Sequence, residues 1–321
     1  MSVREVYLGL DTSNYTTSLG IIGRDGELIA NLKRPLPVKP GERGLRQSDA
    51  VFHHTVNMPE LFADARPILS KSRILAVGVS ARPRSVEGSY MPCFLVGKSV
   101  AEAISAASDA PLYGFSHQGG HIMAALFSSG RLDLVSESFC AFHVSGGTTE
   151  MLSVCFRDGD FIAEKVGGTS DLNAGQVIDR IGVKLGLPFP AGACVEELAL
   201  SNLKKVPSRK ISVKDNYISL SGLENLCDRL YAETEDKPLV CAFVLDYIGR
   251  ALSVLSESYR EQFGNKPIVY AGGVMSNSII KSMLSRYSDT AFAEPRLSSD
   301  NAVGVAHLAR LKFESEINDG H

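Results

Sequence analysis

Residues 6–22 read VYLGLDTSNYTTSLGII, and this stretch predicts a β-hairpin. Residues 6–11 have the apolar composition of a buried strand, residues 12–17 form a turn rich in small hydroxyl side chains, and residues 18–22 form the returning strand. The same order of strand, small-residue turn and strand occurs in residues 139–154, FCAFHVSGGTTEMLSV. The two hairpins lie about one domain apart and indicate a weak internal repeat.

The two hairpin turns are candidate sites for a phosphate group. Small residues let backbone N–H groups approach an anion, and hydroxyl groups add further donors. The alternative is that both are ordinary tight hairpins. On the first interpretation, the candidate nucleotide-binding residues in the two turns or next to them are Asp11, Ser13, Ser145, Gly146, Gly147 and Thr148.

A pair of histidines opens a predicted helix in the segment SHQGGH, residues 116–121. His117 and His121 are four residues apart, so a helix places both imidazoles on one face. Neutral imidazole is the commonest side-chain ligand of transition metals, so the pair is half of a metal site. Alternatively, both histidines only cap or cover the helix start. Asp300 precedes the last predicted helix, where it is either an N-cap or a third metal ligand.

The composition is that of an ordinary globular protein of two domains. The 321 residues are 44% hydrophobic and 21% charged, and the net charge of -3 gives no global attraction to nucleic acid. The six cysteines are scattered without C-x-x-C spacing, which favours buried thiols in a reducing cytoplasm. We see no signal peptide and no stretch approaching the length of a membrane span. We therefore expect a cytoplasmic protein without membrane contact.

Periodicity predicts helices and strands throughout the chain. We expect helices at 51–70, 96–108, from 117, 170–187, 194–202, 238–263 and from about 300 to 313, with further strands at 74–79, 112–115 and 267–271.

Residues 204–214 carry five cations and no acid, and are the best local candidate for phosphate contacts, or else a solvated basic loop. Gly272 and Gly273 join a strand to a helix and permit close approach of a nucleotide.

These motifs, in their order, resemble one family. The chain has H-x-x-x-H at 117–121, S-G-G-T at 145–148, A-G-x-x-x-D at 174–179, S-G-L at 221–223, G-G-V-x-x-N at 272–277 and S-D-N-A at 299–302. This is similar to the tRNA N(6)-adenosine threonylcarbamoyltransferases, once called O-sialoglycoprotein endopeptidases, over almost the whole chain. The resemblance implies an α/β fold of the two-lobed actin-like, sugar kinase and Hsp70 type. The lobes would be residues 1–115 plus 295–321, and 116–294, with nucleotide and metal in the cleft between them.

The resemblance also implies roles for individual residues. His117, His121 and Asp300 match the family's catalytic metal ligands, which usually hold one iron or zinc ion. The turn at Ser145 matches its phosphate-side turn. The implied ribose-side residues are Asp179, Gly192 and Glu196, and the implied adenosine- and phosphate-side residues are Gly272, Gly273 and Asn277. The cofactor would be an adenine nucleotide, namely threonylcarbamoyl-adenylate, AMP or ATP.

The implied activity is transfer of threonylcarbamoyl from threonylcarbamoyl-adenylate to the N(6) amine of the adenosine next to the tRNA anticodon. The expected partners are tRNA, a smaller paralogous subunit and a P-loop ATPase. The old metallopeptidase assignment is disfavoured, because the residue after His117 is Gln118 and not the glutamate that H-E-x-x-H peptidases use as a base.

Some cleft positions depart from the family pattern. An acidic pair in the first turn is replaced by Tyr15 and Thr16, a histidine by Thr148, and one acidic residue by Leu172. These changes indicate a divergent paralogue and leave two alternatives open. The chain could be a regulatory or partner subunit that binds nucleotide and metal without activity, or a carbamoyl transferase that acts on a small molecule.

Overall fold

The computed structural model describes residues 3–13, 15–37, 45–298 and 302–319. The chain forms two compact units. Unit 1 comprises Met1–Leu132, Cys155–Ala163 and Arg296–His321, and unit 2 comprises Asp133–Val154 and Glu164–Pro295. Residues 116–132, which the sequence analysis placed in the second lobe, belong to unit 1, because the helix they form packs against the C-terminal helix of that unit.

Unit 1 contains a five-stranded mixed sheet in the order β3-β2-β1-β4-β5. Its strands are β1 (Arg4–Ser13), β2 (Thr16–Gly23), β3 (Leu28–Pro35), β4 (Ser72–Arg82) and β5 (Leu112–Ser116). The predicted first hairpin is present as the antiparallel pair β1 and β2, and β4 and β5 extend the sheet in parallel.

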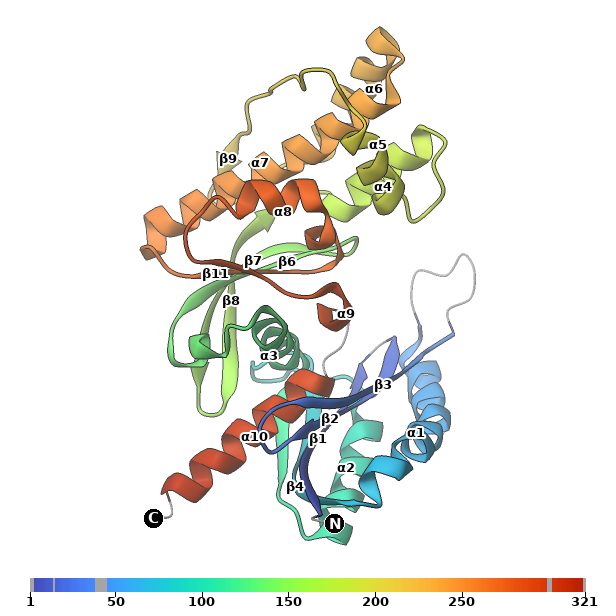
Figure 1. Cartoon of the computed structure of the whole chain (residues 1–321), viewed down its shortest axis with the longest axis vertical. Helices are drawn as coiled ribbons and strands as arrows, with labels where there is room; N and C mark the ends of the chain where they lie inside the picture. The colour runs from blue at the N-terminus through green and yellow to red at the C-terminus, as the bar shows by residue number, and fades with distance from the viewer. Residues whose placement is uncertain (1–2, 14, 38–44, 299–301, 320–321) are drawn as a thin grey trace. The chain divides into compact units, whose positions relative to one another are not determined.

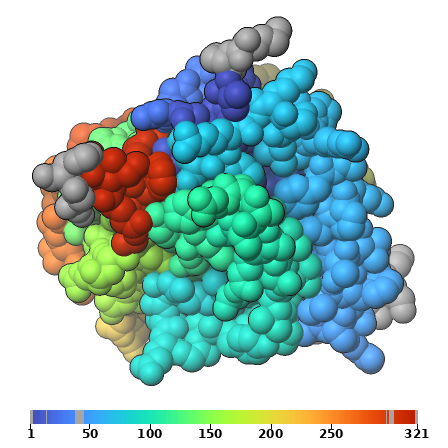
Figure 2. All heavy atoms as spheres, turned by 90° about the horizontal axis from the view of Figure 1, so that it is seen from below, coloured from blue at the N-terminus to red at the C-terminus, as the bar shows by residue number. Residues whose placement is uncertain are grey.

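Helices cover both faces of this sheet (Figure 1). α1 (Gln47–Leu69) and α2 (Phe94–Ser108) pack on one face around Met58 and Ala101. They contact each other and form much of the surface in the space-filling view (Figure 2). α10 (Ala302–Asp319) lies on the other face and also contacts α3 (His117–Ser129).

Two glycines allow α10 to approach the sheet closely. Gly9 and Gly20 are partners across the β1–β2 ladder. A Cβ at Gly9 would lie 2.0 Å from the carbonyl oxygen of Ala302, and one at Gly20 would lie 2.6 Å from its carbonyl carbon. Because backbone atoms of a packed helix cannot move aside cheaply, any side chain at these positions would push α10 off the sheet.

Unit 2 contains a seven-stranded sheet in the order β12-β11-β6-β7-β8-β10-β9. Its strands are β6 (Phe139–Val144), β7 (Thr149–Arg157), β8 (Asp160–Thr169), β9 (Val213–Lys214), β10 (Tyr217–Ile218), β11 (Ile268–Ala271) and β12 (Thr290–Phe292). The tip of the β7–β8 hairpin, Cys155–Ala163, belongs to unit 1, and the rest of these strands belongs to unit 2. The predicted second hairpin is present as β6 and β7.

The helices of unit 2 enclose one large hydrophobic core with the sheet. They are α4 (Ala174–Lys184), α5 (Gly192–Leu200), α6 (Ser221–Thr234), α7 (Lys237–Phe263) and α8 (Ser278–Leu284), with the short α9 (Pro295–Ser298) and 3₁₀ turns at Leu132–Ser136 and Gly273–Ser276. Contrary to the sequence expectation, α7 is long and apolar enough to span a membrane. However, 78% of its most apolar window is buried inside the structure, so α7 is explained as a core helix.

The weak repeat in the sequence corresponds to a repeat in topology. In unit 1 the central strand β1 pairs antiparallel with β2 and parallel with β4, which pairs parallel with β5. In unit 2, β6 likewise pairs antiparallel with β7 and parallel with β11, which pairs parallel with β12. The expected α/β fold with a duplicated mixed sheet is therefore confirmed. The sequence analysis missed β3, β8, β9, β10, β12 and α6.

One buried histidine predicts acid sensitivity. His307 on α10 is 2% exposed, and its Nε2 is buried without a hydrogen-bond partner in the described part of the chain. Burial, aided by the charge of Arg310, lowers the pKa of His307 from 6.5 to about 3. Between these values the unfolded chain binds a proton that the folded chain does not. The free energy of unfolding should therefore fall by up to about 1.4 kcal/mol for each pH unit below 6.5.

Urea unfolding of the wild type and of His307→Leu at pH 7.5 and pH 5 measures this contribution. We expect the wild type to lose about 2 kcal/mol more than the variant between the two values. Equal losses in both proteins would show that His307 does not titrate on unfolding.

Candidate functional site

The two predicted metal-binding histidines lie together at the start of α3. Ser116 caps the helix, because its hydroxyl oxygen accepts a hydrogen bond from the Gly119 amide at 2.9 Å. The imidazole rings of His117 and His121 have centroids 4.7 Å apart, as the spacing on one helix face predicts. The sequence therefore placed both imidazoles correctly relative to each other.

Asp11 orients the first of these imidazoles. Its Oδ2 lies 2.9 Å from His117 Nδ1 and also accepts a hydrogen bond from the Ser80 hydroxyl, while Oδ1 accepts from the Ser13 amide at 2.8 Å. Burial raises the pKa of Asp11, but His117 and these donors outweigh burial and hold the pKa well below its usual range. Asp11 is therefore a buried carboxylate that fixes an imidazole. The sequence predicts a different role for Asp11, as a nucleotide-binding residue.

This donor set fits a divalent transition metal. Metal-binding histidines usually donate their second ring nitrogen to a carboxylate, which sets the tautomer and the ring orientation. With Nδ1 of His117 directed at Asp11, a metal would be held through Nε2 of that ring. Asp300, the predicted third ligand, lies outside the described residues. Within the described ranges, no group of three His, Cys, Asp or Glu residues is arranged to hold a metal.

Asp160 supports the start of α3, a role that the sequence analysis missed. Its carboxylate accepts a hydrogen bond from the Ser116 amide at 2.9 Å and forms an ion pair with Arg82 at 3.0 Å. Gly119 makes room for it, since a Cβ there would lie 2.2 Å from Asp160 Oδ1. The interaction joins segments 44 residues apart in sequence, so no local pattern could reveal it.

In unit 2, the predicted phosphate-side turn is closed by its own serine. Ser145 Oγ accepts hydrogen bonds from the amides of Gly147 and Thr148, at 3.2 and 3.1 Å. A Cβ at Gly146 or Gly147 would meet nothing within 4 Å, so this side of the turn is open. The sequence predicts backbone donors for an anion near Gly146 and Gly147, whereas in the structure the Gly147 amide donates within the turn.

The same turn lies against the N-terminus of α4. The Gly175 amide donates to the Ser145 carbonyl at 3.1 Å, and the Asn173 side chain donates to the Gly147 carbonyl at 2.8 Å. A Cβ at Gly175 would lie 2.7 Å from the Gly146 nitrogen, so the approach requires glycine. Because a helix N-terminus carries partial positive charge, an open turn beside it is suited to an anionic group.

The remaining predicted nucleotide-binding carboxylates hold the helices of unit 2. Asp179 on α4 accepts from the Ala191 amide at 2.8 Å, just before α5 begins at Gly192. Glu196 on α5 accepts from the amide of Ser278, at the start of α8, at 2.7 Å. Each carboxylate thus fixes the start of a neighbouring helix.

The glycine pair and asparagine after β11 also have structural roles. Gly272 has φ +103°, and a Cβ there would lie 2.3 Å from the Val144 carbonyl oxygen, so only glycine fits beside β6. Asn277 caps α8 by accepting from the Ile280 amide at 3.0 Å. Gly273 differs from both, because a Cβ on it would meet no atom within 4 Å.

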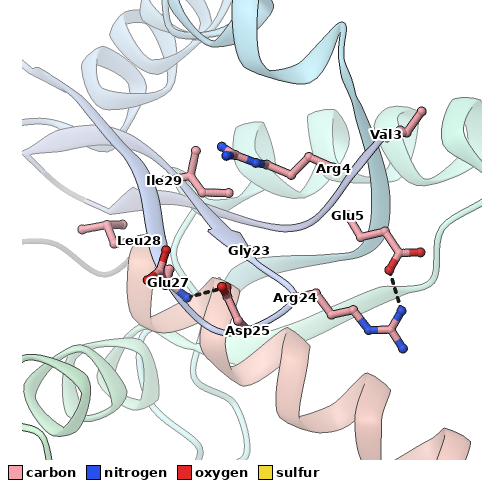
Figure 3. Close-up of a pocket in the computed structure, with 9 residues that line it drawn as sticks. All are labelled: Val3, Arg4, Glu5, Gly23, Arg24, Asp25, Glu27, Leu28 and Ile29. Atoms are coloured by element: carbon pink, nitrogen blue, oxygen red, sulfur yellow. Dashed lines mark hydrogen bonds and ion pairs between the residues drawn. The ribbon is translucent and has the colours of Figure 1, made fainter. Parts of the chain in front are cut away.

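A hollow of about 710 Å³ in unit 1 contains none of the predicted site residues (Figure 3). It lies beside the turn between β2 and β3. Three of the charged side chains that line it have local partners, since Arg24 donates to Glu5 at 2.5 Å and Asp25 accepts from the Glu27 amide at 3.0 Å.

Comparison with known proteins shows which family the chain belongs to. The sequence profile of the tRNA N6-adenosine threonylcarbamoyltransferases matches residues 41–307. The chain belongs to this family. It is 30% identical to the threonylcarbamoyltransferase of Streptococcus equi subsp. zooepidemicus, covering 96% of this chain and 91% of that protein. The Methanopyrus kandleri enzyme is 25% identical over 96% of this chain and 88% of its own length.

A longer relative contains the same region. The probable bifunctional tRNA threonylcarbamoyladenosine biosynthesis protein of Methanocaldococcus jannaschii is 27% identical over 97% of this chain. The chain spans 56% of that protein's length. The membership shows that this chain is of the transferase type.

Solved structures confirm the expected fold. HypF of T. kodakarensis superposes with a TM-score of 0.61 at 14% identity, over 99% of this chain and 48% of that one. The ROK hexokinase of Thermus thermophilus superposes with a TM-score of 0.52 at 14% identity, over 97% and 99% of the two chains. At this identity the likeness shows the sugar-kinase type of fold and nothing of activity.

The structure explains some departures from the threonylcarbamoyltransferase pattern. Leu172 is partly buried and packs against the core of unit 2, so an apolar residue is stabilising there. Thr148 Oγ1 lies 3.3 Å from Nδ1 of His143, which places an imidazole on β6 beside the turn that lacks the family's histidine. Sequence reasoning missed His143, although its position just before the turn was a usable signal. Tyr15 is 50% exposed, and nothing in the structure explains why tyrosine occupies this position.

Proposed function

We propose that this transferase moves the threonylcarbamoyl group of threonylcarbamoyl-adenylate to the N(6) amine of the adenosine next to the tRNA anticodon. The observation that carries the proposal is the arrangement of His117, His121 and the buried Asp11 at the start of α3 in a member of this family. Proteins use such a carboxylate–imidazole pair to position a metal ligand. We propose His117, His121 and Asp300 as ligands of one divalent ion, iron or zinc.

The chain's own groups would have distinct tasks in this reaction. Asp11 keeps His117 in one tautomer and orientation. A bound metal would polarise the carbamoyl carbonyl or hold the threonyl end of the substrate. The partial positive charge at the N-terminus of α4, beside the open turn at Gly146 and Gly147, would stabilise the phosphate charge that develops as AMP leaves. The substrate is a mixed anhydride with a good leaving group, so no covalent enzyme intermediate is required.

The direct test supplies purified protein with threonylcarbamoyl-adenylate, unmodified tRNA, a smaller paralogous subunit and a P-loop ATPase, which we propose as partners. The readout is threonylcarbamoyladenosine in digested tRNA. We expect product formation that depends on this chain. If a family enzyme works as positive control and this protein forms none, the non-catalytic paralogue or a small-molecule carbamoyl transferase replaces the proposal.

The Asp11→Asn variant tests the metal assignment separately from turnover. Asparagine is nearly the same size but cannot provide the negative charge that orients His117. We expect metal affinity to fall about 10- to 100-fold, as is typical for loss of a supporting carboxylate. Titration of the metal-free protein with zinc, followed calorimetrically, measures this change. Unchanged affinity would remove Asp11 from the metal site.

A further inference from the structure

A basic hollow in unit 2 lies outside the site described above. Its volume is about 760 Å³, and it is formed by the segment 208–211, the middle of α7 and the residues around the end of α8. The cationic side chains that line it are Arg209, Lys210, Arg250 and Arg286, against a single acid, Glu257. We call this feature the basic groove. It includes part of the run 204–214 that the sequence analysis selected for phosphate contacts.

Three of these cationic side chains have no acidic partner in the described part of the chain. Arg209, Lys210 and Arg286 are exposed, and the described part of the chain gives their side chains no ion pair. The acid of the groove is engaged, because the Tyr287 hydroxyl donates to Glu257 Oε1 at 2.7 Å. The chain as a whole has a net charge of -3, so this positive surface is a local feature and not a consequence of composition.

Arg250 fixes the segment that presents these charges. Its Nε donates to Asp246 on the same helix, and its Nη1 donates to the carbonyl of Arg209, both at 2.7 Å. The side chain of Ile211 packs against the core on the same segment. Arg209 and Lys210 are therefore held on α7 although they lie outside any helix or strand.

One donor of the groove lacks an acceptor. The Nη2 atom of Arg250 is buried without a hydrogen-bond partner in the described ranges. A buried unsatisfied donor costs free energy comparable to a lost hydrogen bond, unless a ligand supplies the acceptor. Guanidinium groups bind phosphate oxygens through two parallel hydrogen bonds, so this arginine-rich surface fits a phosphodiester backbone.

We propose that the basic groove binds the sugar-phosphate backbone of the tRNA acceptor. The inference rests on the proposed function, since that function supplies RNA as the polyanion. The contact would be independent of base sequence and would contribute affinity and orientation, leaving the chemical step to other residues. It would also be strongly weakened by salt, because neutralising phosphates releases counterions.

The test compares two triple variants with equal loss of charge. The groove variant carries Arg209→Gln, Lys210→Gln and Arg286→Gln. The control variant carries Arg229→Gln, Lys237→Gln and Lys266→Gln, three exposed cations of unit 2 outside the groove. Binding of fluorescent tRNA is measured by anisotropy at several salt concentrations, and thermal unfolding checks that both variants fold. Arg286→Gln alone, on a separate segment, provides a milder change.

We expect the groove variant to bind tRNA at least about 10-fold more weakly than the control variant near 0.1 M salt. Its slope of log affinity against log salt should be smaller by about 2 to 3, as expected for the loss of three phosphate contacts. In the transfer assay its KM for tRNA should rise while kcat stays within about twofold. Arg286→Gln should have an intermediate effect.

The outcomes separate this inference from the proposed function. If the wild type modifies tRNA but both triple variants bind tRNA equally well, the proposal that the basic groove binds tRNA is wrong and the proposed function stands. If the wild type modifies no tRNA but its binding of RNA depends on the basic groove, the proposed function is wrong and RNA binding by the basic groove is supported. If the wild type neither binds nor modifies tRNA, both the proposed function and tRNA binding by the basic groove are wrong. If the basic groove is needed to bind poly-glutamate but not RNA, the proposal that it binds tRNA is wrong.

Discussion

Replacing His117 with glutamine should lower threonylcarbamoyl transfer at least about 100-fold while leaving the protein folded. Glutamine can still donate a hydrogen bond to Asp11, so the buried carboxylate keeps a partner, but it cannot replace imidazole as a transition-metal ligand. In the proposed mechanism His117 helps to hold the metal that would polarise the carbonyl, and loss of such electrostatic stabilisation commonly costs two or more orders of magnitude in rate. The measurement is threonylcarbamoyladenosine formed per minute at saturating tRNA.

His117→Ala provides a second variant with a different expected defect. It removes the imidazole and also leaves the buried Asp11 carboxylate without one of its hydrogen-bond partners, so it should lower stability as well as activity. Gln118→Ala, one residue along the same helix, is the control and should keep most of the activity. Full transfer by His117→Gln would show that this imidazole takes no part in the reaction.

Replacing Gly304 with alanine should destabilise unit 1 by about 2 to 3 kcal/mol, as expected for overpacking a crossing of two helices. A Cβ at Gly304 on α10 would lie 1.9 Å from the carbonyl oxygen of Gly120 and 2.8 Å from the amide nitrogen of Ala124, both on α3. These are backbone atoms, so the helices themselves must separate. Thermal and urea unfolding measure the loss.

Gly304→Ala should also reduce transfer, because Gly120 lies between His117 and His121 and the helix crossing positions both imidazoles. Gly222→Ala on α6 is the matched control. A Cβ there would meet nothing within 4 Å, so it should be neutral or stabilise by up to about 1 kcal/mol. If Gly304→Ala were as stable as Gly222→Ala, the close crossing of α3 and α10 would be wrong.

The sequence by itself determined the features that depend on neighbouring residues. Alternation and small-residue turns predicted both hairpins, and the four-residue spacing predicted that His117 and His121 share one helix face. The order of the motifs identified the family, which the profile match confirms. These signals are local or sequential, so they can be read without knowing which strands pair.

Tertiary structure alone decided which distant groups meet. Asp11 and His117 are 106 residues apart in sequence, and only the tertiary structure brings the Asp11 carboxylate within hydrogen-bond distance of the His117 imidazole. Gly304 has no local signature, since its importance comes from the crossing of α10 with α3. Likewise, the composition of α7 would suit a membrane, and burial in the core of unit 2 decides otherwise. The physical reason is that packing and hydrogen bonding depend on distance in space, whereas sequence patterns report only distance along the chain.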